Sequence, residues 1–170
     1  MSRRFTRRGE GLLVRLSDPE RELLRQLPDE LREAYESDDP DDDVHTRLFP
    51  RAYLDPTEEN AEREWQDLVH PELLRERLDA LARIVGALDA TEGGSRGAHD
   101  VALAPDDVPA LLGVLNDARL ALGTQLGVSE ESDLAALDPD DPATYRFAVY
   151  AWLTELEGEL IDTLLGDMPD

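Results

Sequence analysis

VPALLGVLNDARLALGTQLGV, residues 108–128, is the longest stretch of this sequence with an unbroken helical pattern and a polar centre. Its leucines recur at helical spacing on both sides of a polar centre, which predicts a helix that is buried along much of its length. The polar centre consists of Asn116, Asp117 and Arg119, residue types that a buried helix seldom carries. We therefore predict that this helix is central to the fold and that its three polar side chains have a structural or a functional role.

Two further helices are expected near the ends of the chain. One opens at Ser17-Asp18-Pro19-Glu20, where a capping residue precedes proline and acidic residues, and we expect Pro28 to kink or divide it. The other runs from about Pro142 to Gly166, a residue type that commonly ends helices. Apolar residues at helical spacing predict their buried faces: Leu23, Leu24, Leu27, Leu31 and Tyr35 in the first, and Tyr145, Val149, Trp152, Leu153, Leu156, Leu160 and Leu164 in the second.

Residues 55–90 predict two more helices. Asp55-Pro56 caps the first, and His70-Pro71 is expected to break it. The first contains Trp65, which is most simply a core residue, as is Trp152. The second helix has an amphipathic stripe in which apolar residues alternate at spacings of four and three: Leu74, Leu78, Leu81, Val85 and Leu88.

The N-terminal residues predict a small β element. Phe5–Arg8 and Leu12–Leu16 flank Gly9-Glu10-Gly11, whose two glycines suit a hairpin turn. Val101–Leu103 is a candidate third strand that would pair with this hairpin. The predicted fold is therefore mainly α, a bundle of about five main helices with a small N-terminal β-hairpin.

We expect residues 1–170 to form one domain, because this length suffices for a single substantial core. Within it, residues 1–16 are the hairpin arm and residues 17–90 the first helices. Residues 91–104 are a link that contains the candidate strand, and residues 105–168 are the C-terminal helices.

The composition excludes several classes of function. The chain has 40 acidic and 17 basic residues, a net charge of −23, and such a surface repels nucleic acid phosphates and favours basic partners. It contains no cysteine, which excludes disulfides, thiolate metal sites and cysteine nucleophiles. No apolar run approaches the roughly 18 residues of a membrane-spanning helix. Because no apolar segment follows the N-terminal arginines either, we expect a cytoplasmic protein without a membrane partner.

One short motif imitates a catalytic site. Gly93-Gly94-Ser95-Arg96-Gly97 matches the G-x-S-x-G pattern of serine hydrolases, and His99-Asp100 follows it closely. That pattern works only on a strained turn between a strand and a helix, which exposes the serine above a sheet. Here it follows a helix within a glycine-rich link, so we interpret it as a linker and predict no catalytic residues.

The acidic residues do not predict a metal site. Asp39, Asp41 and Asp43 have the initial spacing of a calcium loop, but its glycine position holds Val44 and its glutamate position Pro50. Asp138 and Asp140 fail in a similar way. Asp67-Leu-Val-His70 is the only near-match to a helical di-metal motif, which requires two such pairs. We therefore expect no metal ligands and no cofactor.

The arginine-rich N-terminus has two interpretations. Arg3, Arg4, Arg7 and Arg8 surround Phe5 and would form a basic arm that contacts a phosphate backbone or an acidic partner. Alternatively, these arginines flank a hairpin strand and pair with acidic residues of the same chain. We favour the second interpretation and do not expect nucleic acid binding, because the field of the whole chain opposes the approach of DNA.

The polar residues of the central helix, Asn116, Asp117 and Arg119, also have two interpretations. They form either a structural network that joins neighbouring elements or the lining of a small polar pocket. A buried Asp–Arg pair needs good geometry to offset the loss of hydration. We favour the structural interpretation and keep the pocket as the alternative.

Several motifs in this order resemble an actinobacterial family described as a domain of unknown function. They are the arginine-rich hairpin with Gly9, Arg47-Leu48-Phe49-Pro50-x-Ala52-Tyr53, Leu115-Asn116-Asp117-x-Arg119-Leu120-x-Leu122-Gly123, and Tyr150-x-Trp152-Leu153. The resemblance covers nearly the whole chain, although Pro28 and the acidic loops depart from it. It implies a cytoplasmic protein that is commonly encoded beside ClpS, the adaptor for Clp-type proteolysis, and it assigns no activity.

We expect a non-enzymatic cytoplasmic protein that binds or regulates another protein, with a link to Clp-type proteolysis as the finer hypothesis. One alternative is a DNA-associated transcriptional regulator that uses the arginine arm. A second alternative is an enzyme with a site at Asn116, Asp117 and Arg119.

Overall fold

Helices and a small sheet make up the part of the chain that the computed structural model describes, residues 3–91, 97–129, 138 and 140–166. The strands are β1 (Phe5–Arg8), β2 (Gly11–Ser17) and β3 (Ala98–Leu103), which form an antiparallel sheet in the order β1-β2-β3. The helices are α1 (Asp18–Tyr35), α2 (Asp43–Leu48), α3 (Glu59–Asp89), α4 (Asp107–Leu126) and α5 (Pro142–Leu165), and the 3-10 turn η1 (Pro56–Glu58) precedes α3. The predicted mainly α class is confirmed.

The sheet buries one face against the helices. Phe5, Val14 and Val101 are neighbours in the register of the three strands, and all three side chains are buried. Buried and more exposed side chains alternate from Leu12 to Ser17 in β2 and along β3, because successive side chains of a strand point to opposite faces. Gly9 has a φ of 62°, a left-handed conformation that the tight turn between β1 and β2 requires. The predicted third strand is also confirmed and begins earlier than expected, at Ala98.

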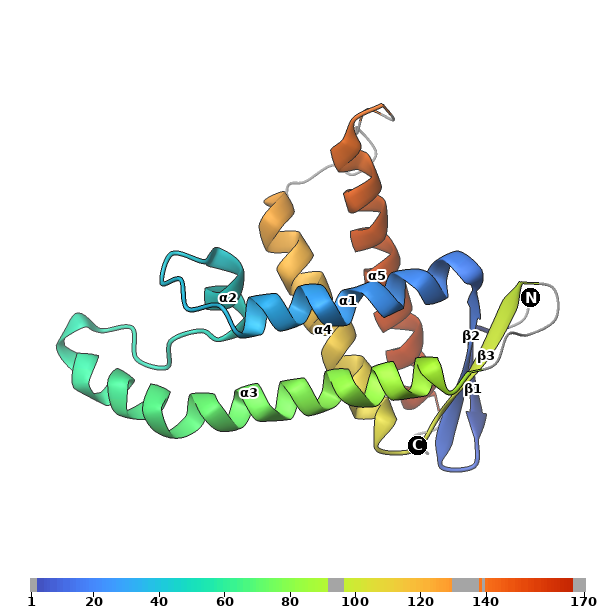
Figure 1. Ribbon diagram of the computed structural model, residues 1–170, viewed down its shortest axis with the longest axis horizontal. Helices are drawn as coiled ribbons and strands as arrows, with labels where there is room; N and C mark the ends of the chain where they lie inside the picture. Colours follow the sequence, from blue (N-terminus) through green and yellow to red (C-terminus); the bar gives the residue numbers. More distant parts are fainter. Residues whose placement is uncertain (1–2, 92–96, 130–137, 139, 167–170) are drawn as a thin grey trace.

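The helices cross one another in two layers. Figure 1 shows α1 and the longer α3 lying across α4 and α5, with the sheet at one end of the bundle. Leu81, Leu115 and Leu153, from α3, α4 and α5, are fully buried where these layers meet. Every described helix falls short of the combined length and apolar character that a membrane-spanning helix requires.

The predicted break at His70-Pro71 is wrong, and of the two outcomes expected for Pro28, a kink or a division, the division does not occur. Pro28 lies inside α1 and Pro71 lies inside α3, and both helices are continuous. A proline inside a helix costs roughly 3 kcal/mol because one backbone hydrogen bond is lost. Pro28 is itself buried, so its ring adds to the apolar contact that holds α1 in place. Pro71 is exposed, so water can hydrate the carbonyl of Asp67 that has lost its partner.

The two helices predicted between residues 55 and 90 are therefore one, α3, whereas the short α2 was not predicted. Asp42 caps α2, because its side chain accepts hydrogen bonds from the backbone of Val44 and His45. The expected burial of Tyr145 is also wrong, since its side chain is 63% exposed. Figure 1 shows that the N-terminal end of α5, which contains Tyr145, extends beyond α1.

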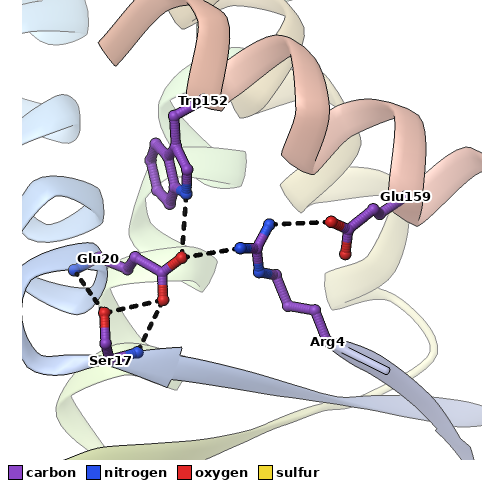
Figure 2. A network of polar contacts seen from close by, with 5 residues as sticks. All are labelled: Arg4, Ser17, Glu20, Trp152 and Glu159. Atoms are coloured by element: carbon purple, nitrogen blue, oxygen red, sulfur yellow. Dashed lines mark hydrogen bonds and ion pairs between the residues drawn. The ribbon is translucent and has the colours of Figure 1, made fainter. Parts of the chain in front are cut away.

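A single carboxylate joins the sheet to two helices. Glu20, in the first turn of α1, accepts hydrogen bonds from the backbone and hydroxyl of Ser17 at 2.8 and 2.9 Å. Its other oxygen accepts from Arg4 at 2.9 Å and from the indole of Trp152 in α5 at 3.1 Å (Figure 2). Arg4 also reaches Glu159 of α5 at 3.1 Å. The N-terminal segment, the end of β2, α1 and α5 therefore meet at one residue.

The electrostatic surroundings of Glu20 favour its ionised form. Burial by itself raises the pKa of this carboxyl, but the hydrogen bonds from Ser17 and Trp152 and the charge of Arg4 outweigh burial and lower the pKa. A carboxyl whose pKa is lower in the folded state stabilises the fold above its unfolded pKa, and this contribution disappears as the pH falls through the folded value.

We predict that Glu20→Gln lowers the free energy of unfolding by about 1–3 kcal/mol at neutral pH, because a charged acceptor of several hydrogen bonds is lost. The difference from the wild type is expected to shrink as the pH falls below 4.5, the ordinary pKa of glutamic acid. Urea unfolding at a series of pH values measures both effects. Glu22→Gln, at an exposed position of α1, is the matched control, and an equal loss in both variants would contradict the prediction.

Candidate functional site

The three predicted polar residues of α4 face two different interfaces. Asp117 is buried and contacts α1 and α3. Arg119 pairs with Glu157 of α5, with 3.0 Å between Nε and Oε2. Asn116 accepts a hydrogen bond from Arg119 at 3.3 Å. Asn116 and Arg119 are therefore in contact, whereas Asp117 has separate partners.

Asp117 takes part in a buried network that spans four helices. Its Oδ2 accepts a hydrogen bond from the hydroxyl of Tyr35 in α1 at 2.6 Å and lies 3.4 Å from Nε of Arg77 in α3. Arg77 also donates to the carbonyl of Leu48 in α2 at 2.6 Å, and its guanidinium lies 4.3 Å from the centre of the Phe49 ring. The network thus fixes α2 and α3 against the middle of α4, and we call it the Asp117 network.

Burial dominates the electrostatics of the Asp117 network. It raises the pKa of Asp117, although the hydrogen bond from Tyr35 and the charge of Arg77 act in the opposite direction. Burial, followed by the charge of Asp117, also raises the pKa of Tyr35. The Tyr35 hydroxyl therefore stays protonated and remains a hydrogen-bond donor at any ordinary pH.

Two histidines lie beside this network. His45 of α2 donates a hydrogen bond from Nδ1 to the carbonyl of Ala34 at 2.8 Å, because a carbonyl can only accept. The ring of His70 in α3 lies 4.6 Å from that of Phe49 and 5.7 Å from that of His45, measured between ring centres. Burial, then the charges of His45 and Arg77, lowers the pKa of His70, so His70 is neutral at pH 7.

Helix α1 crosses α4 and α5 (Figure 1). Residues of these three helices line an apolar groove, which we call the α1–α4–α5 groove. Its volume is about 420 Å³. Leu23, Leu122 and Val149 are half-buried and line its floor. The exposed side chains at its rim are mostly polar: Gln26, Glu30, Glu33, Tyr145 and Arg146.

The N-terminal arginines have different surroundings. Arg4 belongs to the Glu20 network, and Arg7 donates to the carbonyl of Leu164 at 3.3 Å. Arg3 and Arg8 are exposed, and neither forms a hydrogen bond or ion pair within the part of the chain that the structure describes. Two of the four arginines therefore form hydrogen bonds within the chain, and the other two are exposed to solvent.

The remaining motifs do not assemble into a site among the described residues. Residues 93–96 of the hydrolase-like pattern lie outside the described residues, and Gly97 adopts a φ of 71° directly before β3. Asp39 accepts a hydrogen bond from the backbone of Asp41, and Asp138 does the same for Asp140, as turn residues do. Within the described ranges, no three His, Asp or Glu side chains converge as metal ligands do.

The partners of the α4 residues were not predicted from the sequence. Arg77 occupies the apolar stripe of α3, three residues after Leu74 and four before Leu81. Glu157 likewise lies between Leu153 and Leu160 on the buried face of α5. A charged residue within an apolar stripe needs a partner when it is buried, so this pattern is the signal that could have predicted both pairs.

Comparison with known proteins places this chain in a family. A family model described as "Domain of unknown function (DUF2017)" matches residues 2–164. The chain belongs to this family. The resemblance inferred from its motifs is thus confirmed at the level of the DUF2017 family.

Relatives of known name include the oxidative stress regulator AosR of Mycobacterium tuberculosis and that of Mycobacterium bovis. Each is 30% identical to this chain over 156 residues, which covers 92% of the chain and 62% of the relative. The chain therefore spans less than two thirds of the length of these relatives. No solved structure matches the chain.

We predict that Tyr35→Phe lowers the free energy of unfolding by about 1–3 kcal/mol, because the buried carboxylate of Asp117 loses a hydrogen bond that water cannot replace. Tyr145→Phe removes the same hydroxyl from an exposed ring and is expected to change stability by less than about 0.5 kcal/mol. Chemical denaturation of both variants measures the difference. Equal stability of the two variants would show that the Asp117 network does not support the fold.

Proposed function

We propose that this DUF2017 chain is a non-enzymatic regulatory domain that acts by binding a helical segment of another protein. The observation that carries the proposal is the α1–α4–α5 groove, an apolar floor with a mostly polar rim. Grooves of this kind bind an amphipathic helix, whose apolar side chains at helical spacing enter the groove while its polar face stays in water.

The charges of the chain favour a basic partner segment. The groove rim carries Glu30 and Glu33, and the whole chain has a net charge of −23. Such a field attracts basic segments and speeds their association, while apolar contacts in the groove supply most of the affinity. The partner that fits is a helix with leucine-like side chains on one face and lysine or arginine on the other.

A relative's name supports the regulatory part of the proposal. The mycobacterial relatives are named oxidative stress regulators, and we extend a regulatory role, not their partners or targets, to this chain. The 170 residues contain no cysteine, so thiol oxidation within them is excluded as a signal.

We predict that a fluorescent synthetic peptide with leucine and lysine at helical spacing binds the chain, and that Tyr145→Ala weakens binding by at least about fivefold. Tyr145 lies at the groove rim and is 63% exposed, so its removal leaves the fold intact. Fluorescence anisotropy measures the affinity. Leu68→Ala is the matched control, because this leucine is 78% exposed on α3, outside the groove.

The charge requirement is tested separately with a peptide in which glutamate replaces lysine, which is expected not to bind. Equal affinities of the Tyr145→Ala and Leu68→Ala variants for the lysine peptide would contradict the groove as the binding surface. Purified ClpS belongs in the same assay, because the link to Clp-type proteolysis is the finer form of the proposal. Binding of ClpS that depends on Tyr145 would support that link.

A DNA-associated regulator is the second candidate. Arg3 and Arg8 favour it, because both are exposed and neither forms a hydrogen bond or ion pair with the residues that the structure describes. The net charge of −23 opposes it. We expect no mobility shift of duplex DNA at low salt. A shift that disappears in the Arg3→Ala, Arg8→Ala double variant would instead favour DNA binding.

A further inference from the structure

A second hollow, on the opposite face of α4 from the groove, is lined by basic and uncharged residues. It is an open cleft of about 470 Å³ between α2, the C-terminal half of α4 and α5, and we call it the Arg47 cleft. Among the described residues that line it, the charged ones are Arg47 and Arg119, and none is acidic. The chain has 40 acidic residues, so a cleft whose described charged lining residues are both arginines is a specific local arrangement.

The two arginines are prepared for a ligand in different ways. Glu157 and Asn116 hold Nε and Nη2 of Arg119, which fixes the guanidinium and leaves Nη1 without a partner among the described residues. Arg47 is exposed, and within the described part of the chain it forms no hydrogen bond or ion pair. The guanidinium of Arg119 is thus preorganised, and the exposed guanidinium of Arg47 can close on a ligand.

Tyr150 of α5 forms the wall of the cleft, and Gly123 permits this position. A Cβ at Gly123 would lie only 3.1 Å from the Tyr150 ring, so the ring lies directly over the α4 backbone. The Tyr150 hydroxyl also lacks a hydrogen-bond partner among the described residues. The cleft therefore offers a phenol donor in addition to the two guanidinium groups.

The end of α4 would repel an anion if its carbonyls were free, because a helix C-terminus carries partial negative charge. Here several carbonyls near the C-terminus of α4 accept hydrogen bonds from backbone amides or from a hydroxyl. The backbone of Gly127 bonds to Thr124 at 3.2 Å, the backbone of Val128 bonds to Gly123 at 2.9 Å, and the Thr124 hydroxyl donates to Leu120 at 2.8 Å. These bonds reduce the negative potential that the helix end directs at the cleft.

We propose that the Arg47 cleft binds an oxyanion, the phosphate or carboxylate group of a small acidic ligand, between Arg47 and Arg119. The planar fork of an arginine matches both groups and binds either through two parallel hydrogen bonds. The distant carboxylates of the chain oppose the ligand weakly, because at physiological salt charges beyond about 8 Å are screened. This site is independent of the proposed partner groove, which uses the other face of α4.

Titration of the ¹⁵N-labelled full chain with inorganic pyrophosphate, and separately with citrate, tests the proposal. We expect saturable chemical-shift changes at the backbone amides of Gly123, Gly127 and Val128, and calorimetry then gives the affinities. A response to pyrophosphate alone identifies a phosphorylated ligand, and a response to citrate alone identifies a polycarboxylate. Responses to both identify a general oxyanion site.

Arg47→Gln is expected to weaken binding by at least about tenfold, because one of two charge-assisted contacts is lost. Arg63→Gln is the matched control, since it makes the same charge change at an exposed arginine of α3 that does not line the cleft. Tyr150→Phe tests the phenol, and a loss of affinity of about threefold is expected from one neutral hydrogen bond. Far-ultraviolet circular dichroism confirms that each variant is folded.

Three results would overturn the proposal. The first is an absence of saturable binding of either probe, and the second is an equal loss of affinity in Arg47→Gln and Arg63→Gln. The third is a set of shift changes confined to the exposed arginines Arg3 and Arg8 of the N-terminal arm. None of these results bears on the peptide-binding groove, so the two proposals fail separately.

Discussion

The carboxylate of Glu20 is the interaction on which the arrangement of sheet and helices depends. It caps α1 through Ser17, receives Arg4 from the N-terminal segment and receives the indole of Trp152 from α5. Glu20 therefore caps the start of α1 and also holds the N-terminal segment and α5 in position. The same ionised group serves all three, and the ion pair between Arg4 and Glu159 adds a second electrostatic link to α5.

Within the bundle, α4 uses its polar residues to hold different neighbours. Asp117 holds α1 and α3 through Tyr35 and Arg77, and Arg119 holds α5 through Glu157. Buried charges are costly unless they are paired, so each pair specifies which helix lies on which side of α4. The same arrangement separates the two hollows, an apolar one on the α1 side and a basic one on the side of Arg47.

Local signals in the sequence predicted local structure well. The capping residues at Ser17 and the glycine turn at Gly9 are properties of a few neighbouring residues, and each marked a real element. The continuity of α3 through Pro71 was not predictable in this way, because tertiary packing outweighs the local preference. The partners of Asp117 and Arg119 were missed because they lie far away in the sequence, and both hollows form only when several helices meet.

The sheet joins the first strands of the chain to a strand that follows three helices, since β2 pairs with β3 and residues 11–17 meet residues 98–103. During synthesis the N-terminal hairpin must therefore wait, with one edge of β2 open, until the chain has grown past Leu103. Pairing over such a distance in sequence closes a long loop and is a slow step in folding. Rapid formation of α1 and α3 would then be needed to prevent the unpaired edge of β2 from pairing with strands of other chains.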